Sequence, residues 1–284
     1  MAPAQTLHSI LEEVKSLEPL PQVALRVMAL SQQDELIPND LVGVIQTDAG
    51  LTGKVLKLAN SAYYGFRREI ASLSEAGNLL GTNKLLNLVL TSCTARYFRR
   101  YGSQAGGEGE RQWERSLSTA LAAGMIARPR GNVERERAYT AGLLENVGHL
   151  VMARFLPDVE AELAGALAGG ATRLEAEERV LGIHHAEIGA RLAERWDFPP
   201  LLVDTIRHHH EPTEAEIDPL LASCAHLGEV IAQRLEERAG YAPPAYELSG
   251  SALMLTGLPA QELDTFEDCV RAELERARDL VDLG

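Results

Sequence analysis

The chain has 284 residues, of which 27 are lysine or arginine and 41 are aspartate or glutamate, so its formal net charge is −14. This acidic balance disfavours nucleic acids and anionic membranes as partners, because both require clustered cations. With 45% hydrophobic and 24% charged residues, the composition excludes a disordered or fibrous protein. The charge is unevenly distributed, because residues 1–150 carry a net +1, residues 151–284 carry −15 and the segment 51–100 carries +6.

The chain shows no sign of secretion or membrane insertion. Its N-terminus lacks the apolar core and cleavage site of a signal peptide, and no apolar run approaches the ~18 residues that a membrane span needs. The three cysteines are widely spaced and form no CxxC pair, so we expect each of them to be a small buried apolar residue. We therefore expect a reduced, cytoplasmic protein without a membrane segment.

The hydrophobic pattern is helical from the N-terminus onward. In the segment 20–30, apolar residues recur at spacings of three and four, and neither alternating strand-like stretches nor hairpin turn signals appear. The sequence Pro-Asn-Asp before Leu41 predicts a helix start with Asn39 or Asp40 as the N-cap. Asp48 is expected to cap the next helix.

The rest of the chain is predicted to be helical as well. The glycine-rich stretch 102–109 is the most loop-like part of the sequence, and it separates an N-terminal helical lobe (1–103) from a second helical lobe (110–284). Trp113 and Trp196 are expected to anchor the core. The sequence thus predicts an all-α fold, in which the helices of the second lobe beyond residue 133 cover about 134–155, 158–168, 172–182, 185–196, 200–209, 218–238 and 260–281.

The histidines are the first candidates for chemistry. Five of the eight fall in two clusters, His184-His185 and His208-His209-His210, and grouped imidazoles in a helical protein suggest a metal or phosphate site. Successive helical residues point about 100° apart, so three consecutive histidines cannot all face one pocket. Two of them, such as His209 and His210, could share a site with His185. The alternative is that they cap the C-terminal end of the 200–209 helix, where the helix dipole favours them.

Four further residues are spaced as helix-borne ligands would be. A phosphohydrolase built on helices needs neutral imidazoles and carboxylates that converge on a divalent cation. Glu145, Asn146 and Glu229 supply such oxygen atoms, whereas Arg115 cannot bind a metal because its guanidinium stays protonated and has no acceptor.

A resemblance to a known family connects these residues. Between Leu17 and Pro212 the chain resembles the HDOD family (HD-related output domain), with Ala49 where the family usually has proline. The resemblance implies an all-helical domain related to HD-type metal-dependent phosphohydrolases, whose second lobe is an HD-like bundle. Its members are mostly regulatory modules of bacterial signalling proteins, sometimes behind a receiver domain. The resemblance rests on the segments LEPLPQVALRVMAL, IQTDAGLTGKVLKLANSAYYGF, WERS, AGLLENVGHLVMARF, LGIHHAEIGARLAERWDFP and IRHHHEP.

The metal ligands of the superfamily are only partly present in this chain. Under the resemblance, Arg115 stands where the first ligand histidine lies, Glu145 and Asn146 replace the His-Asp pair, and Glu229 takes the place of the final aspartate. A guanidinium at the first position would repel a dication. We therefore expect no metal, no cofactor and no catalytic residue. We also hypothesise that Arg115 and Glu145 form an ion pair that fills the space of the lost metal.

Three functions remain open. The favoured one is a non-catalytic regulatory output module that acts through protein–protein contacts. The second is a metal-dependent phosphohydrolase or phosphodiesterase with an altered site, and the third is a nucleotide or anion sensor that uses the remnant pocket beside Arg115. The residues left for an altered metal site are Glu145, Glu229 and the three histidines that match those of HDOD and HD-GYP proteins, His185, His209 and His210.

The N-terminal lobe supplies a candidate interaction surface, formed by Asn60, Ser61, Tyr64, Arg67 and Arg68. The alternative is that Asn60 and Gly65 shape a helix end and a turn. The expected partners are regulatory proteins, including a fused or cognate receiver or sensor protein.

Overall fold

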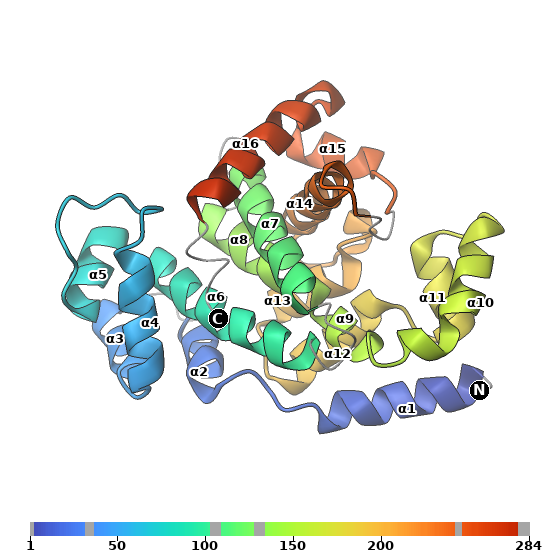
Figure 1. The fold of residues 1–284 in the computed structure, drawn as a ribbon, viewed down its shortest axis with the longest axis horizontal. Coiled ribbons are helices and arrows are strands. Elements are labelled where there is room, and N and C mark those ends of the chain that lie inside the picture. Colours follow the sequence, from blue (N-terminus) through green and yellow to red (C-terminus); the bar gives the residue numbers. More distant parts are fainter. Residues whose placement is uncertain (1–2, 32–36, 103–108, 128–133, 242–245, 278–284) are drawn as a thin grey trace.

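The computed structural model describes residues 3–31, 37–102, 109–127, 134–241 and 246–277, and this part of the chain contains helices and no strand (Figure 1). The all-α prediction is therefore confirmed. The first half of the chain forms six helices in the described part, namely α1 (Pro3–Ser16), α2 (Gln22–Leu30), α3 (Pro38–Ile45), α4 (Ala49–Ala59), α5 (Leu73–Leu80) and α6 (Thr82–Gly102).

The second half is built around longer helices. It contains α7 (Gly109–Ala127), α8 (Arg135–Leu144), the 3₁₀ turn η2 (Glu145–Gly148), α9 (His149–Met152), α10 (Leu156–Ala168), α11 (Arg173–Leu181), α12 (His185–Arg195), α13 (Pro200–His208), the 3₁₀ turn η3 (Pro212–Glu214), α14 (Pro219–Arg238), α15 (Gly250–Thr256), the 3₁₀ turn η4 (Ala260–Glu262) and α16 (Leu263–Arg276).

Several predicted helix boundaries are confirmed and others are corrected. Asp48 caps α4, because its Oδ1 accepts a hydrogen bond from the backbone N–H of Leu51 at 2.9 Å. Neither Asn39 nor Asp40 caps α3, since the proline at the first helical position moves the N-cap back to Ile37. The single helix predicted over 134–155 is broken by η2, and α15 was not predicted.

Helices α7, α8 and α14 pack together in the middle of the molecule, while α3, α4 and α5 gather at one end (Figure 1). Helix α1 packs against α9, α11 and α12 of the second half, so the N-terminal segment reaches across to it. The predicted division at 103–110 remains a prediction, because residues 103–108 lie outside the described part. In that part, no helix combines the length and hydropathy needed to cross a bilayer.

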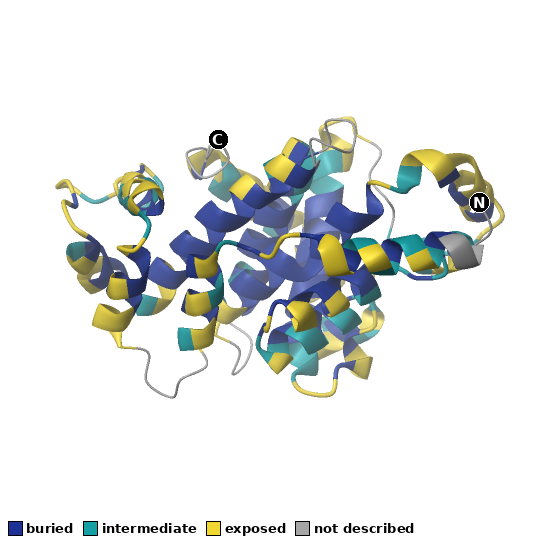
Figure 2. Cartoon of the chain, turned by 90° about the horizontal axis from the view of Figure 1, so that it is seen from below, coloured by how far each residue is buried: buried dark blue, intermediate teal, exposed yellow. Residues whose placement is uncertain are grey.

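A continuous buried core extends from α1 to α16 (Figure 2). Trp113 and Trp196 both belong to it, as predicted. Cys93 and Cys224 are also buried, but Cys269 is exposed on α16 and corrects the expectation that all three cysteines are internal.

Glycines allow the central helices to approach one another closely. A Cβ atom on Gly142 or Gly228 would lie within 3 Å of the Thr119 carbonyl oxygen, so α8 and α14 both press against the backbone of α7. At Gly148 the approach is closer still, because an added Cβ would fall 2.0 Å from the carbonyl oxygen of His185. This contact brings η2, which carries Glu145 and Asn146, against the start of α12.

Candidate functional site

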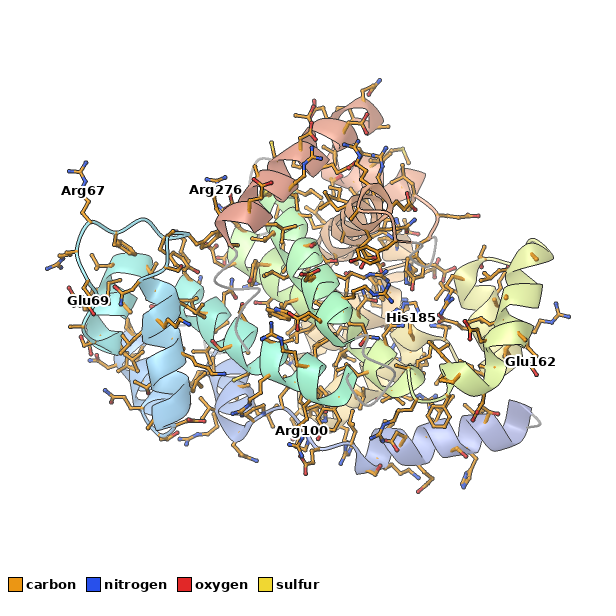
Figure 3. All side chains as sticks on the ribbon, in the orientation of Figure 1. Arg67, Glu69, Arg100, Glu162, His185 and Arg276 are labelled. Carbon is orange, nitrogen blue, oxygen red and sulfur yellow. The ribbon has the colours of Figure 1, made fainter. Side chains whose placement is uncertain are left out.

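A buried cluster of three histidines and one glutamate lies where three helices of the second half meet, and Figure 3 labels one of its members, His185. His185 begins α12, His209 and His210 follow the end of α13, and Glu229 lies on α14. One nitrogen or oxygen atom from each of these four side chains lies within 4.8 Å of the others. The exposed fraction is 0% for His185 and His209 and 1% for Glu229. The structure therefore brings together the three histidines that the sequence singled out.

The neighbouring histidines have other roles. His208 points to Asp204, with 3.7 Å between Nε2 and Oδ1. His184 is the N-cap of α12, since its Nδ1 accepts a hydrogen bond from the Glu187 N–H at 3.3 Å. Two of the three consecutive histidines thus share the centre, in agreement with helical geometry.

Hydrogen bonds determine which ring nitrogens are free. Nδ1 of His209 lies 2.7 Å from the carbonyl oxygen of Ile206, which can only accept, so Nδ1 carries the proton. Its Nε2 is then a bare lone pair, and this atom has no hydrogen-bond partner in the structure. Burial lowers the pKa of His209 and His210 well below 6.5, so both rings stay neutral near pH 7.

Glu177 of α11 packs against the outside of the centre, and nothing in the sequence distinguished it from its neighbours. Its Oε2 accepts hydrogen bonds from the backbone N–H of His185 at 3.0 Å and from His185 Nδ1 at 2.7 Å. Arg173 donates to its other oxygen at 2.5 Å. Although burial alone would raise the pKa of this carboxyl, His185 and Arg173 together lower it to about 2. The residue is one of several acidic residues on α11, and only the tertiary contact distinguishes it.

His149 and Tyr246 close another side of the centre and were also missed. The rings of His149 and His185 are stacked with centroids 4.1 Å apart, and His149 Nε2 lies 3.1 Å from the Tyr246 hydroxyl. The Tyr246 ring in turn packs 4.3 Å from that of His210. His149 lies in one of the segments that resemble the HDOD family, so the resemblance could have pointed to it. Tyr246 lies beyond the matched region.

Asn146 and Glu145 lie next to the cluster and are joined to it through Glu229. Nδ2 of Asn146 donates to Glu229 Oε1 at 2.9 Å and to Glu145 Oε1 at 3.3 Å. Glu145 is fully buried, and its Oε2 has no hydrogen-bond partner. Burial and the nearby Glu229 raise the pKa of Glu145 well above 4.5, which favours the neutral, protonated form of its carboxyl group.

The hypothesised Arg115–Glu145 ion pair is wrong. Arg115 pairs with Glu236, whose two carboxylate oxygens both lie 3.1 Å from Arg115 Nε, and the two side chains are 14% and 16% exposed. The physical reason is solvation. A guanidinium is stabilised near the surface by an ionised carboxylate, whereas the fully buried and protonated Glu145 offers no countercharge.

The donor set is suited to a divalent cation. Three imidazoles and one carboxylate are ligands that zinc and related ions accept, and the unpartnered atoms His209 Nε2 and Glu229 Oε2 both belong to the set. The cluster also satisfies part of its hydrogen bonding without an ion, because Nε2 of His185 and Nε2 of His210 share a hydrogen bond of 2.8 Å. Since Arg115 is paired with Glu236, its charge is compensated and repels a dication less strongly than an unpaired guanidinium would. The expectation that the chain holds no metal stays a prediction.

The candidate interaction surface on the N-terminal lobe is only partly exposed. The Asn60 side chain bonds the backbone of Ile70 in both directions, at 2.7 and 2.9 Å, so it shapes the turn after α4. Ser61 is buried and cannot belong to a contact surface. Tyr64 is half-buried, while Arg67 and Arg68 are exposed.

The fold and this centre define an HD-related helical protein. The family model of the HDOD domain matches residues 17–212, and the chain belongs to the HDOD family. A relative from Treponema pallidum (strain Nichols), an uncharacterised protein, is 28% identical over 229 residues. The match covers 76% of this chain but 42% of that protein, so the chain spans less than half the length of this relative.

Solved structures share the fold. An HDOD domain protein of unknown function from Geobacter sulfurreducens superposes with a TM-score of 0.72 at 22% identity, covering 99% of this chain and 97% of that one. A candidate phosphohydrolase from Shewanella amazonensis SB2B gives 0.69 at 25% identity, covering 96% and 97%. A candidate signal transduction protein from Marinobacter aquaeolei VT8 gives 0.75 at 23% identity, covering 99% and 65%.

Proposed function

We propose that this HDOD protein is a non-catalytic regulatory module of a cytoplasmic bacterial signalling pathway, which acts through contacts with other regulatory proteins. The observation that carries the proposal is the state of the former first-ligand position. Arg115 is bound to Glu236 and contributes no ligand, while Glu145, in place of the histidine of the His-Asp pair, is fully buried, and burial favours its protonated form.

The burial of the centre supports this proposal. A hydrolytic metal needs an open coordination position for water and a path for the substrate. His210 is the most exposed of the four cluster side chains, at 6%. Four of the cavities on the described part of the protein, those lined by Tyr139, Arg115, Cys269 and Met28 respectively, do not include any of these four residues in their walls. The cluster is therefore suited to stabilising the second half of the protein, where α12, α13 and α14 meet.

The convergence of three imidazoles and Glu229 favours a second candidate, a metal-dependent phosphohydrolase. His185, His209, His210 and Glu229 would hold the cation. A bound divalent ion would supply a Lewis acid and a water of lowered pKa. In this case Glu177 and the Ile206 carbonyl would orient the rings of His185 and His209 through their Nδ1 protons.

Hydrolysis assays with a matched pair of variants separate the two candidates. Purified protein is incubated with Mn²⁺ or Fe²⁺ and with cyclic dinucleotides or nucleoside monophosphates, alongside His209→Ala and His208→Ala. We expect no turnover above background in any of the three proteins. Turnover that is lost in His209→Ala and retained in His208→Ala would overturn the non-catalytic proposal.

The regulatory role is tested by recovering partners from the native host. The bait is the full-length protein, compared with Arg67→Glu in the exposed turn and Lys57→Glu on the exposed face of α4. We expect a specific regulatory protein to be recovered by the wild type and by Lys57→Glu and to be lost with Arg67→Glu. Equal recovery by all three baits would show that the turn that contains Arg67 does not belong to the interface.

A further inference from the structure

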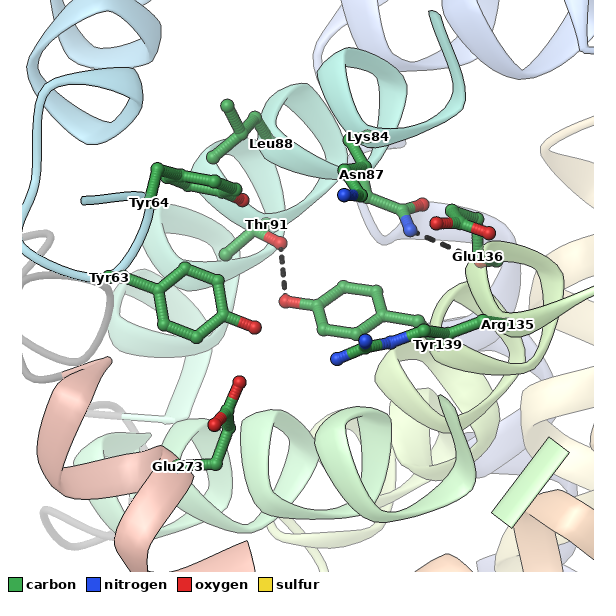
Figure 4. A pocket seen from close by; sticks show the side chains of 10 residues that line it. All are labelled: Tyr63, Tyr64, Lys84, Asn87, Leu88, Thr91, Arg135, Glu136, Tyr139 and Glu273. Carbon is green, nitrogen blue, oxygen red and sulfur yellow. Dashed lines mark hydrogen bonds between the residues drawn. The ribbon is translucent and has the colours of Figure 1, made fainter. Parts of the chain in front are cut away.

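A second polar cavity lies apart from the histidine centre, between the two halves of the chain (Figure 4). Its volume is about 230 Å³. Four segments distant in sequence form its wall, namely the turn after α4, α6, α8 and α16. None of the residues of the histidine cluster lines it. The residues that do are Tyr63, Tyr64, Lys84, Asn87, Leu88, Thr91, Arg135, Glu136, Tyr139 and Glu273.

Aromatic rings form much of the cavity wall. Tyr63 and Tyr64 meet edge to face with ring centroids 4.8 Å apart, and Tyr139 faces them from α8 (Figure 4). The Tyr139 hydroxyl is fixed by a hydrogen bond of 2.9 Å to the Thr91 hydroxyl. These phenol rings present flat apolar faces together with hydroxyl groups, a combination suited to a planar ring that carries polar substituents.

Two cationic side chains also line the cavity. Among the described residues, Arg135 and Lys84 form no ion pair and no side-chain hydrogen bond, although both line the space. Arg135 extends into it beneath the Tyr139 ring (Figure 4). Glu273 also lines the cavity, but it forms an ion pair with Arg276 of the same helix. An arginine and a lysine that line one small space are typical partners for a phosphate group.

Two carboxylates narrow the class of ligand further. Glu136 and Glu273 are hydrogen-bond acceptors in the same wall, and they favour a ring that carries an N–H or amino donor. A volume of about 230 Å³ is below the usual range of drug-sized pockets, roughly 300–1,000 Å³, which suits a ligand with one ring system whose remainder reaches solvent.

From this arrangement, we propose that the cavity binds a purine nucleoside monophosphate. Its phosphate contacts Arg135 and Lys84, its base lies against Tyr63 and Tyr139, and its ring N–H or amino groups donate to Glu273. The bound ligand would join the turn after α4 to α8 and α16 and so link the two halves of the protein. This site is independent of the proposed regulatory function and of the histidine centre.

Isothermal titration of the full chain tests the proposal. The probes are AMP, GMP, adenosine and inorganic phosphate, and the variants are Arg135→Gln and Arg137→Gln. Arg137 lies on the same helix but does not line this cavity, so it is the matched control. A third variant, His209→Ala, reports on the histidine centre.

We expect AMP or GMP to bind at least tenfold more tightly than adenosine or inorganic phosphate. Arg135→Gln should weaken this binding at least tenfold, while Arg137→Gln and His209→Ala should change it less than twofold. Three results would overturn the proposal: no binding of either nucleotide at millimolar concentration, equal affinity for inorganic phosphate, or equal effects of the two arginine variants. Binding lost only in His209→Ala would instead place the ligand in the histidine centre.

Discussion

The histidine centre and the cavity between the two halves are both rich in polar side chains, but they differ in how those side chains are solvated and paired. In the centre, charged and polar groups are buried and must satisfy one another. Glu177 is ionised between His185 and Arg173, while burial raises the pKa of Glu145 and favours its protonated form. In the cavity, Arg135 and Lys84 can remain unpaired because the space is open to water.

This difference suggests how polar groups that stabilise an HD-related fold can be separated from polar groups that are available to a ligand. Buried polar groups that are satisfied within the protein contribute to its stability, and removing one partner is costly. Partly exposed groups without partners contribute little to stability and are available to a ligand. The two regions should therefore respond differently to mutation.

The largest loss of stability is expected when the close contact between η2 and α12 is disturbed. The substitution Gly148→Ala places a Cβ 2.0 Å from the His185 carbonyl oxygen, where only backbone movement can relieve the clash. We expect a loss of more than about 4 kcal/mol in the free energy of unfolding, or failure to fold. Gly53→Ala on α4 is the control, because its Cβ meets nothing within 4 Å, and it should be neutral or stabilising by up to about 1 kcal/mol. Chemical denaturation measures both, and a Gly148→Ala protein as stable as the wild type would contradict the close packing.

The next largest loss of stability is expected when the ionised carboxylate of Glu177 is removed from the centre. Glu177→Ala leaves Arg173 and the His185 N–H groups without their acceptor and should cost roughly 3–5 kcal/mol, whereas the exposed Glu178→Ala should cost less than about 0.5 kcal/mol. Because the pKa of Glu177 is lowered from 4.5 to about 2, its stabilisation is complete above pH 4.5 and is lost as the pH falls toward 2. The difference in urea unfolding between the wild type and Glu177→Ala should therefore shrink below pH 4.5. A difference that is independent of pH would show that Glu177 is not ionised in the folded protein.

A smaller effect distinguishes the observed Arg115–Glu236 pair from the one hypothesised from the sequence. Arg115→Ala should cost about 1–3 kcal/mol, because a partly buried carboxylate loses its charged donor. Glu145→Gln should change stability by less than about 1 kcal/mol, since a neutral amide replaces an already neutral carboxyl group. Thermal and urea unfolding at pH 7 measure both variants. If Glu145→Gln were the more damaging of the two, Glu145 would have to be ionised and paired.

The smallest effects are expected in the cavity between the halves. Tyr139→Phe removes the hydrogen bond to Thr91 and should cost about 0.5–1.5 kcal/mol. Arg135→Gln should stay within about 0.5 kcal/mol of the wild type, because Arg135 has no partner to lose among the described residues. Differential scanning calorimetry would detect a larger loss, which would assign Arg135 a structural role and weaken the comparison between the two regions.

Much of the fold was predictable because helical periodicity is a local property. The apolar spacing predicted an all-α chain, Asp48 was correctly identified as an N-cap, and Trp113 and Trp196 were correctly placed in the core. Helix ends that depend on close packing were not predictable. The break at Glu145–Gly148 follows from the contact between Gly148 and His185, which are far apart in the sequence.

For the candidate site, the sequence by itself determined the residue types that form the centre, because the histidine clusters and the family motifs are visible in it. The tertiary structure decided the partners. Arg115 binds Glu236 and not Glu145, Glu177 supports His185, and Tyr63, Tyr139 and Glu273 meet around one cavity. The physical reason is that pairing depends on burial. Whether a carboxyl group is ionised, neutral or free for a ligand follows from its solvation, and solvation is set by segments that are distant in the sequence.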